Sequence, residues 1–167
     1  MRASCGLLLL LGMLWLAPPQ ARADDLDDDP SFISLGGGYF DPYRQRDTAA
    51  EFRGEYRSGY RFWLFKPFAG AMVTTDSAFY LYGGILVDLY FGDRIVVTPS
   101  FAPGYYERGD GFDLGHRLEF RSAIEIAYRF DNRARLGIGY SHMSNASISD
   151  NNPGVETAFI MLSIPLR

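Results

Sequence analysis

Three residues in the last third of the chain, His142, Ser144 and Glu156, are of the types that nucleophilic ester chemistry requires. A serine hydroxyl is a weak nucleophile until a base accepts its proton. An imidazole can be that base when a carboxylate orients it and stabilises its cation. Ser141 is a rival nucleophile and Asp150 a rival acid. A His-x-Ser pair alone is weak evidence, so the hypothesis depends on whether the backbone brings the three side chains together.

An ester hydrolase must also stabilise the oxyanion of its tetrahedral intermediate, which is often the largest catalytic contribution. Asn152, directly before Pro153-Gly154, could donate its side-chain amide. Backbone N–H groups near Ser147 are the other candidates. This chemistry needs no metal or cofactor.

The two segments that carry these residues alternate in polarity with a period of two, which predicts β-strands over 134–145 and 155–166. Residues two apart on a strand share a face, so His142 and Ser144 point the same way. On the first strand they share this face with apolar residues, namely Leu136, Ile138 and Tyr140. On the second strand Glu156 shares a face with Ala158, Ile160, Leu162 and Ile164, which are also apolar. We therefore expect the trio on the apolar face of two neighbouring antiparallel strands. The same parity turns Ser141 to the other face and leaves Asp150 in a loop.

The clearest strand spans 116–130, where apolar and charged residues strictly alternate. The charged set alternates in sign (Arg117, Glu119, Arg121, Glu125 and Arg129), and the segment 51–57 repeats the pattern with Glu51, Arg53, Glu55 and Arg57. Alternating signs on one face predict ion pairs that fill a narrow barrel interior.

The polarity pattern predicts eight such strands along the chain, near 31–41, 50–59, 62–74, 78–91, 94–106, 116–130, 134–145 and 155–166. Tight turns are expected at 58–61, 92–93 and 131–133, and longer connections at 41–49, 103–115 and 145–154. Short periplasmic turns and longer external loops are the pattern of bacterial outer-membrane barrels. Aromatic residues make up 16% of the chain, and several are expected in interfacial girdles (Trp63, Tyr90, Tyr105 and Tyr106). The fold class is therefore all-β, an eight-stranded antiparallel transmembrane β-barrel.

The N-terminus has the layout of a cleavable secretory signal: Arg2, an apolar run over 7–16, and Ala21-Arg22-Ala23. We expect a signal peptide over 1–23 and one barrel domain over 24–167, with no disulfide because Cys5 lies in the signal.

The net charge of −4 argues against nucleic acid as a partner. The acidic run (Asp24, Asp25, Asp27, Asp28 and Asp29) is expected to be a solvated tail rather than a metal site.

With both ends periplasmic, the strand 134–145 runs outward. The step from Leu136 to Ser144 covers roughly 20 Å of height after strand tilt. Ser144 then lies near the outer boundary of the hydrocarbon, where a polar side chain costs little and where the acyl esters of the outer leaflet lie.

Two blocks resemble those of a known family, the PagL-type lipid A 3-O-deacylases. They are His142-Met143-Ser144-Asn145-Ala146 and Asn152-Pro153-Gly154-Val155-Glu156, with this gap between them, and the similarity extends over roughly 78–166. Two features depart from the family: Ser147 stands where glycine is frequent, and the C-terminus lacks the terminal aromatic residue of barrel-assembly signals.

The resemblance implies an eight-stranded barrel in the bacterial outer membrane that removes the 3-hydroxyacyl chain from the 3-position of lipid A without a metal. In this chain His142 would be the base, Ser144 the nucleophile and Glu156 the orienting acid. Asn145 matches a residue important for activity, and Asn152 matches the oxyanion-hole side chain. The partner would be lipopolysaccharide of the outer leaflet, and a homodimer is possible. Two alternatives stay open: a non-catalytic structural or adhesin-type barrel, and an acyltransferase that uses the same trio.

Overall fold

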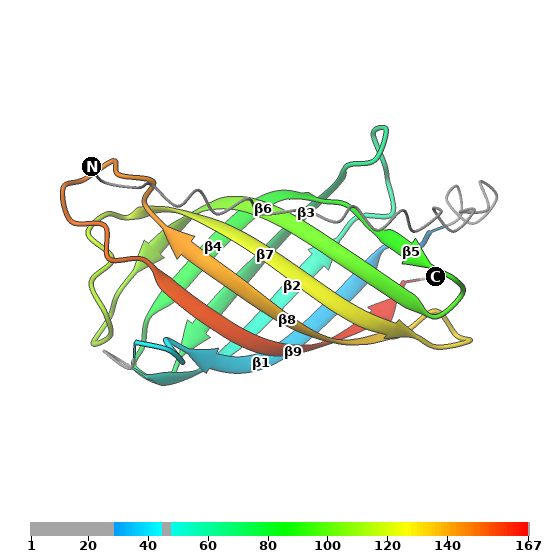
Figure 1. Ribbon diagram of the computed structural model, residues 1–167, viewed down its shortest axis with the longest axis horizontal. Helices are drawn as coiled ribbons and strands as arrows, with labels where there is room; N and C mark the ends of the chain where they lie inside the picture. Colours follow the sequence, from blue (N-terminus) through cyan, green and yellow to red (C-terminus); the bar gives the residue numbers. More distant parts are fainter. Residues whose placement is uncertain (1–28, 45–47, 167) are drawn as a thin grey trace, which may run out of the picture.

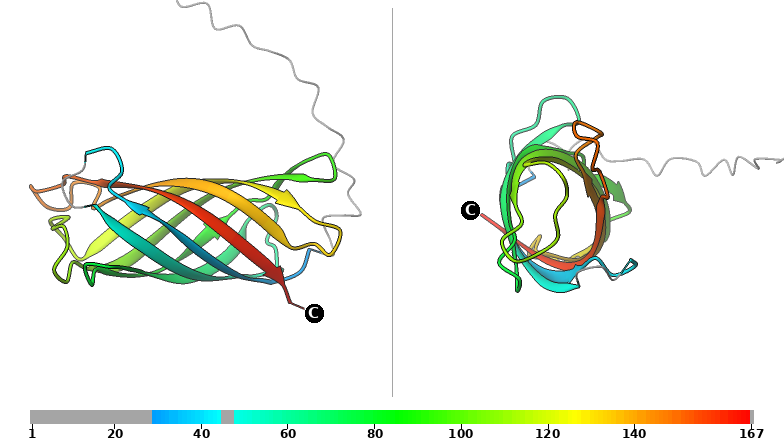
Figure 2. Two further views of the ribbon diagram at one scale, coloured as in Figure 1. Left: turned by 90° about the horizontal axis from the view of Figure 1, so that it is seen from below. Right: turned by 90° about the vertical axis from the view of Figure 1, so that its left-hand side faces the viewer.

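The computed structural model describes residues 29–44 and 48–166. They form a closed antiparallel barrel whose strands follow one another round the wall in chain order (Figures 1 and 2). The strands are β1 (Phe32–Phe40), β2 (Ala49–Arg57), β3 (Lys66–Thr74), β4 (Phe79–Leu86), β5 (Leu89–Phe91), β6 (Ile95–Glu107), β7 (Leu118–Arg129), β8 (Arg135–Ser144) and β9 (Val155–Pro165). Pairing of β1 with β9 and of β4 with β6 closes the sheet.

Strands β4 and β5 are one wall strand with a short interruption, which makes the barrel eight-stranded, as predicted. Leu86 pairs with Ser100 and Leu89 pairs with Val97, so the register is unchanged across the gap. The interruption lies opposite Pro99, whose carbonyl accepts the Val87 N–H at 3.1 Å. Proline has no N–H to return to the ladder, so the pairing is incomplete at this point.

One end of the barrel carries the segments 41–44, 75–78, 108–117 and 145–154, and we call it the loop end. The other, the terminal end, carries Asp29 and Leu166 together with the connections 58–65, 92–94 and 130–134. The two shorter connections at the terminal end agree with the predicted tight turns.

Along every strand, apolar side chains point outward and the alternate positions point into the bore. The outward set includes large exposed residues on all the wall strands, for example Leu35, Phe52, Val73, Leu81, Phe101, Ile126, Ile138 and Ile160. A continuous apolar outer wall is the surface that a transmembrane barrel presents to lipid, and it confirms the predicted parity. Within the part of the chain that the structure describes, no helix has the length and hydropathy needed to cross a bilayer.

The middle of the bore is filled by the predicted ion pairs. Arg57 donates to Glu55 at 2.9 Å and to Glu125 at 2.7 Å, and Arg121 donates to Glu55 at 3.1 Å. The Tyr82 hydroxyl donates to the same Glu55 at 2.8 Å. The cavity that these residues line has a volume of only about 10 Å³, so the bore is packed rather than open.

The predicted ladder is wrong at Arg117 and Glu119, whereas the predicted pair of Glu51 and Arg53 is formed in the bore. Both carboxylate oxygens of Glu119 are buried without a hydrogen-bond partner in the described residues, and Arg117 lies outside the bore, 3.6 Å from Glu107. In the loop half of the bore, Leu114 from the β6–β7 loop packs in an apolar cluster, beside buried charged residues that include Glu51 and Arg53. The apolar filling consists of Phe40, Met72, Tyr80, Ala102, Tyr106, Met143 and Val155 around Leu114.

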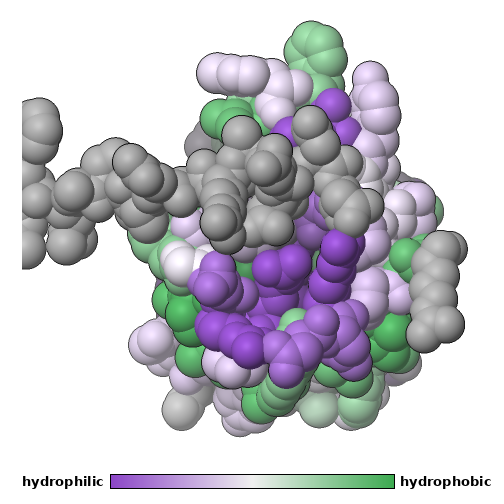
Figure 3. Space-filling model, turned by 90° about the vertical axis from the view of Figure 1, so that its right-hand side faces the viewer, coloured by the Kyte–Doolittle hydropathy of each residue, from purple (hydrophilic) through white to green (hydrophobic). Residues whose placement is uncertain are grey.

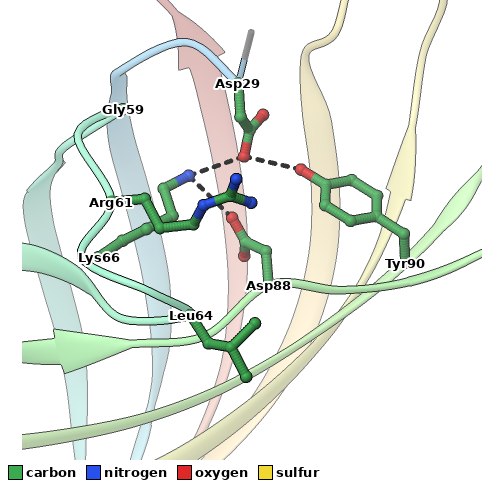
Figure 4. A pocket seen from close by; sticks show the side chains of 7 residues that line it. All are labelled: Asp29, Gly59, Arg61, Leu64, Lys66, Asp88 and Tyr90. Atoms are coloured by element: carbon green, nitrogen blue, oxygen red, sulfur yellow. Dashed lines mark hydrogen bonds and ion pairs between the residues drawn. The ribbon is translucent and has the colours of Figure 1, made fainter. Parts of the chain in front are cut away.

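Charged side chains close the terminal end of the bore. Asp29 is one of them, so the prediction that it belongs to a solvated tail is wrong. Its carboxylate accepts hydrogen bonds from Lys66 at 2.7 Å and Tyr90 at 2.7 Å (Figure 4). It also accepts one from Arg135 at 3.1 Å. Lys66 and Arg135 each also lie 3.0 Å from Asp88. Viewed from this end, hydrophilic residues fill the centre and hydrophobic ones the rim (Figure 3). The remaining acidic residues of the tail (24–28) and the predicted signal peptide lie outside the described residues.

The connection between β2 and β3 is longer than the predicted tight turn at 58–61, because β3 starts at Lys66 rather than at residue 62. Residues 62–65 are Phe-Trp-Leu-Phe, which leaves no polar position for the interior face of a wall strand. They form a small separate hairpin instead, with Phe62 and Phe65 hydrogen-bonded to each other at 2.9 and 3.0 Å.

Candidate active site

The candidate site lies on the outer wall at the loop end, on β8 and β9. His142 and Glu156 are direct cross-strand partners in the antiparallel pair. Their side chains meet on the outside of the barrel, with Nδ1 of His142 3.3 Å from Oε1 of Glu156. The His142 side chain is 47% exposed and the Glu156 side chain only 12%. An accessible imidazole is thus oriented by a mostly covered carboxylate.

Ser144 is two residues from His142 on β8 and has the same parity. In the described residues no hydrogen bond joins its hydroxyl to the imidazole, so the structure groups the three side chains on one face without forming the serine–histidine contact. Catalytic hydrogen bonds are often long or poorly aligned before substrate binds.

The rival residues are placed as parity predicts. Ser141 points into the bore, where its hydroxyl is 2.7 Å from that of Thr157. Asp150 lies in the loop between β8 and β9, on no strand.

Asn145 organises the loop that follows β8. It is completely buried, and its amide nitrogen donates to the carbonyls of Leu114 and Asn151 at 2.9 and 2.8 Å and to the Ser149 hydroxyl at 3.1 Å. Its backbone N–H donates to the side-chain oxygen of Asn152 at 3.1 Å. That bond fixes the amide orientation of Asn152 and leaves its Nδ2 group as the free donor.

The same loop begins with a tight turn of strained residues. Ile148 N–H donates to the Asn145 carbonyl at 3.1 Å, and the two central residues, Ala146 and Ser147, have φ of 53° and 63°. Two positive φ angles define a type I′ turn, for which glycine or asparagine is preferred. The N–H groups of Ala146 and Ser147 donate to no acceptor among the described residues, so both are available to an incoming oxyanion.

Gly154 is a site residue that the sequence marked only as part of a motif. Its φ is 61°, and a Cβ placed on it would lie 2.9 Å from Cε1 of His142. Any other residue here would strain the backbone and press on the imidazole. Gly154 therefore sets where the ring can lie.

Arg44, in the loop after β1, is a second residue that the sequence analysis missed. Its guanidinium donates to the Pro153 carbonyl and lies 3.7 Å from Oε1 of Glu156. The neighbouring Tyr43 packs edge-on against Tyr140, with ring centroids 6.1 Å apart. These contacts exist because β1 pairs with β9 and closes the barrel, which brings the first loop beside the last one.

The site contains no cluster suited to a metal: residues 29–44 and 48–166 include no group of three or more His, Cys, Asp or Glu side chains that could hold one. The cavity of Figure 4 is at the opposite end of the barrel and has a volume of about 20 Å³, too small for a ligand.

The model of one protein family, described as Lipid A 3-O-deacylase (PagL), matches residues 42–165, which include the whole of the site described above. The chain belongs to the PagL family. A solved structure described as the crystal structure of the outer membrane enzyme PagL is similar in fold, with a TM-score of 0.64 and 19% identity over 81% of this chain and 99% of that one.

A second similar structure is a de novo designed transmembrane β-barrel, with a TM-score of 0.59 and 11% identity over 81% of this chain and 95% of that one. No curated protein matches the sequence significantly. PagL membership and the closed barrel indicate the bacterial outer membrane as the location.

Proposed function

We propose that this PagL-family protein hydrolyses the ester that links a 3-hydroxyacyl chain to the 3-position of lipid A, with Ser144 as nucleophile, His142 as base and Glu156 as orienting acid. The observation that supports this most directly is the contact between Nδ1 of His142 and Oε1 of Glu156 on the outer wall. A histidine–carboxylate pair is unusual on a surface that otherwise presents apolar side chains to lipid, and a serine of the same parity lies two residues away.

In the proposed reaction His142 takes the proton of the Ser144 hydroxyl through Nε2 as the oxygen attacks the ester carbonyl. The carbonyl becomes an oxyanion, which the Asn152 amide and the Ser147 N–H stabilise. Collapse of this intermediate breaks the bond to the sugar oxygen, which leaves with the proton from His142. Water then attacks the acyl-serine in the same way, and a free 3-hydroxy fatty acid is released while Ser144 recovers its proton.

The position of the site suits a substrate that stays in the membrane. The trio lies on the wall, not in a cavity, so a lipid can approach sideways while its acyl chains stay beside the outward residues Ile138 and Ile160. Water reaches the site from the loop end. This geometry supplies a nucleophile at the lipid–water boundary, where the acyl esters lie.

The test is a mass spectrum of lipid A from cells that express the wild-type chain or the Ser144→Ala variant. The wild type is expected to remove one 3-hydroxyacyl chain, and the variant to leave lipid A intact while still showing the heat-dependent gel mobility of a folded barrel. An unchanged wild-type spectrum would indicate a structural barrel, and a heavier lipid would indicate an acyltransferase. The comparisons give no support for a homodimer, and the proposed trio comes from one chain.

A further inference from the structure

The connection between β2 and β3 carries the most exposed aromatic side chains at the terminal end. Tyr60, Phe62 and Trp63 are 71%, 74% and 74% exposed. Figures 1 and 2 show this segment, coloured teal, standing out sideways from the wall rather than extending along the barrel axis. Its apolar tip therefore projects into the space beside the barrel.

Trp63 occupies a backbone position that favours glycine. It is the first of the two central residues of the turn between Phe62 and Phe65, and its φ is 58°. A two-residue hairpin with a positive φ at the first position is the II′ type, in which that position is normally glycine. This backbone strain holds a bulky apolar ring at the exposed tip, where an apolar surrounding outside the chain would stabilise it.

The base of the segment is fixed to the barrel, so its direction is set by the fold. Gly59 N–H donates to the Ser31 hydroxyl at 2.9 Å, and Ser58 N–H donates to the Pro67 carbonyl at 3.0 Å. A Cβ on Gly59 would lie 2.6 Å from the Asp29 carbonyl, which shows how closely the segment packs on the N-terminal residues. Leu64 turns back and lines the charged cluster at the barrel mouth (Figure 4).

Aromatic rings also point outward from other parts of the wall at the terminal end. At this end Tyr56 points outward on β2, and Tyr128 packs edge-on against Phe130 at 5.1 Å between centroids. Arg94 lies 5.9 Å from the centre of the Tyr128 ring. Aromatic rings accompanied by arginine are typical of the level at which hydrocarbon meets lipid headgroups.

We propose that residues 58–65 form a lateral membrane anchor, in which Phe62 and Trp63 insert into the phospholipid interface around the terminal end. Lipid is the expected occupant because the tip projects sideways from a wall whose outward side chains are themselves apolar. This leaflet is the one opposite to the candidate active site. The anchor adds contact area on one flank of the barrel and restrains its depth and tilt in the bilayer.

Tryptophan fluorescence tests the anchor independently of any catalytic activity. The sequence has two tryptophans, Trp15 and Trp63, so the full-length chain with Trp15→Phe, isolated from membranes and reconstituted in zwitterionic phospholipid vesicles, reports on Trp63 alone. We expect blue-shifted emission, strong quenching by phospholipids brominated near the ester groups, weaker quenching by bromines at the chain ends, and little quenching by iodide in water.

A red-shifted emission that iodide quenches would overturn the proposal. A blue-shifted emission that no brominated lipid quenches would also overturn it, because the ring would then be covered by protein, either a second copy or another chain. In the same background, Phe62→Ser should shift the Trp63 emission to the red and increase iodide quenching. Tyr43→Ser removes an exposed ring at the opposite end and should change neither. An unchanged spectrum for Phe62→Ser would refute the joint insertion of the two rings.

Discussion

Replacing Glu156 by glutamine isolates the contribution of its negative charge to the proposed chemistry. Oε1 faces Nδ1 of His142 at 3.3 Å, while Oε2 is buried without a hydrogen-bond partner in the described residues. A glutamine can keep its oxygen toward the imidazole and place its amide group where Oε2 already lacks a partner. The geometry of the site is thus retained and only the charge is lost.

The size of the effect follows from the distance. Two unit charges 3.3 Å apart interact by about 1.3 kcal/mol at the dielectric constant of water and by about 5 kcal/mol at an effective value of 20. The His142 side chain is half-exposed and Glu156 is mostly covered, so the site lies between these limits. Loss of the charge that stabilises the imidazolium should therefore lower kcat by roughly 10- to 10³-fold, with a smaller change in KM.

The assay is single-turnover release of 3-hydroxy fatty acid from lipid A in detergent micelles, measured by mass spectrometry. Glu107→Gln is the matched control, since Glu107 also lies at the loop end, is 48% exposed and contacts Arg117 instead of the site. It should retain the wild-type rate. A Glu156→Gln variant within twofold of the wild type would refute the charge argument, and one as inactive as Ser144→Ala would show that the carboxylate does more than stabilise a cation.

Four further outcomes are expected. Asn152→Ala should lower kcat roughly 10²–10³-fold through loss of an oxyanion donor, and an unchanged rate would exclude that role. Arg44→Gln should lower activity roughly 2–10-fold, because the hydrogen bond that joins the first and last loops is weakened; equal rates in the same micelle assay would contradict this. Ser147→Gly should raise the free energy of unfolding by about 1 kcal/mol, since its φ of 63° costs glycine nothing, whereas Ser147→Ala should give no gain in thermal denaturation. Asp29→Asn should destabilise the barrel by about 2–3 kcal/mol, because Lys66 and Arg135 would then share the single charge of Asp88, while Asp131→Asn, at an exposed turn, should leave the denaturation midpoint unchanged.

Strand parity was sufficient to predict the face on which the candidate site lies. The side-chain period of a strand is fixed by the backbone, so His142, Ser144 and Glu156 had to share the apolar face once their segments were strands. The polarity of the neighbouring residues identified that face as the outer one. For the same reason Ser141 was correctly directed into the bore.

Contacts across the barrel could not be read from the sequence in the same way. Arg44 reaches Glu156 only because β1 closes the sheet against β9, and Asp29 reaches Arg135 only through the bore. Such contacts depend on the stagger of the strands, which polarity patterns do not specify. The same limitation explains Glu119, whose place in the alternation predicted an ion pair although both of its carboxylate oxygens lack a hydrogen-bond partner in the described residues.

The segment 58–65 shows a different limitation. Residues 62–65 are all apolar, so their polarity does not alternate. Such a run is compatible with the start of a strand, a turn or a projecting hairpin, and the polarity pattern does not distinguish these three structures. The packing of Gly59 against the N-terminal residues decides between these possibilities, and that contact is made only in the folded chain.

The packed bore has an electrical consequence. Apolar side chains around Leu114 close one end, paired charges around Glu55 occupy the middle, and Asp29 with its cations closes the other. Under an applied voltage, a planar bilayer that contains this barrel should carry no more current than the lipid alone. A cell can therefore hold many copies in its outer membrane without making that membrane permeable to ions.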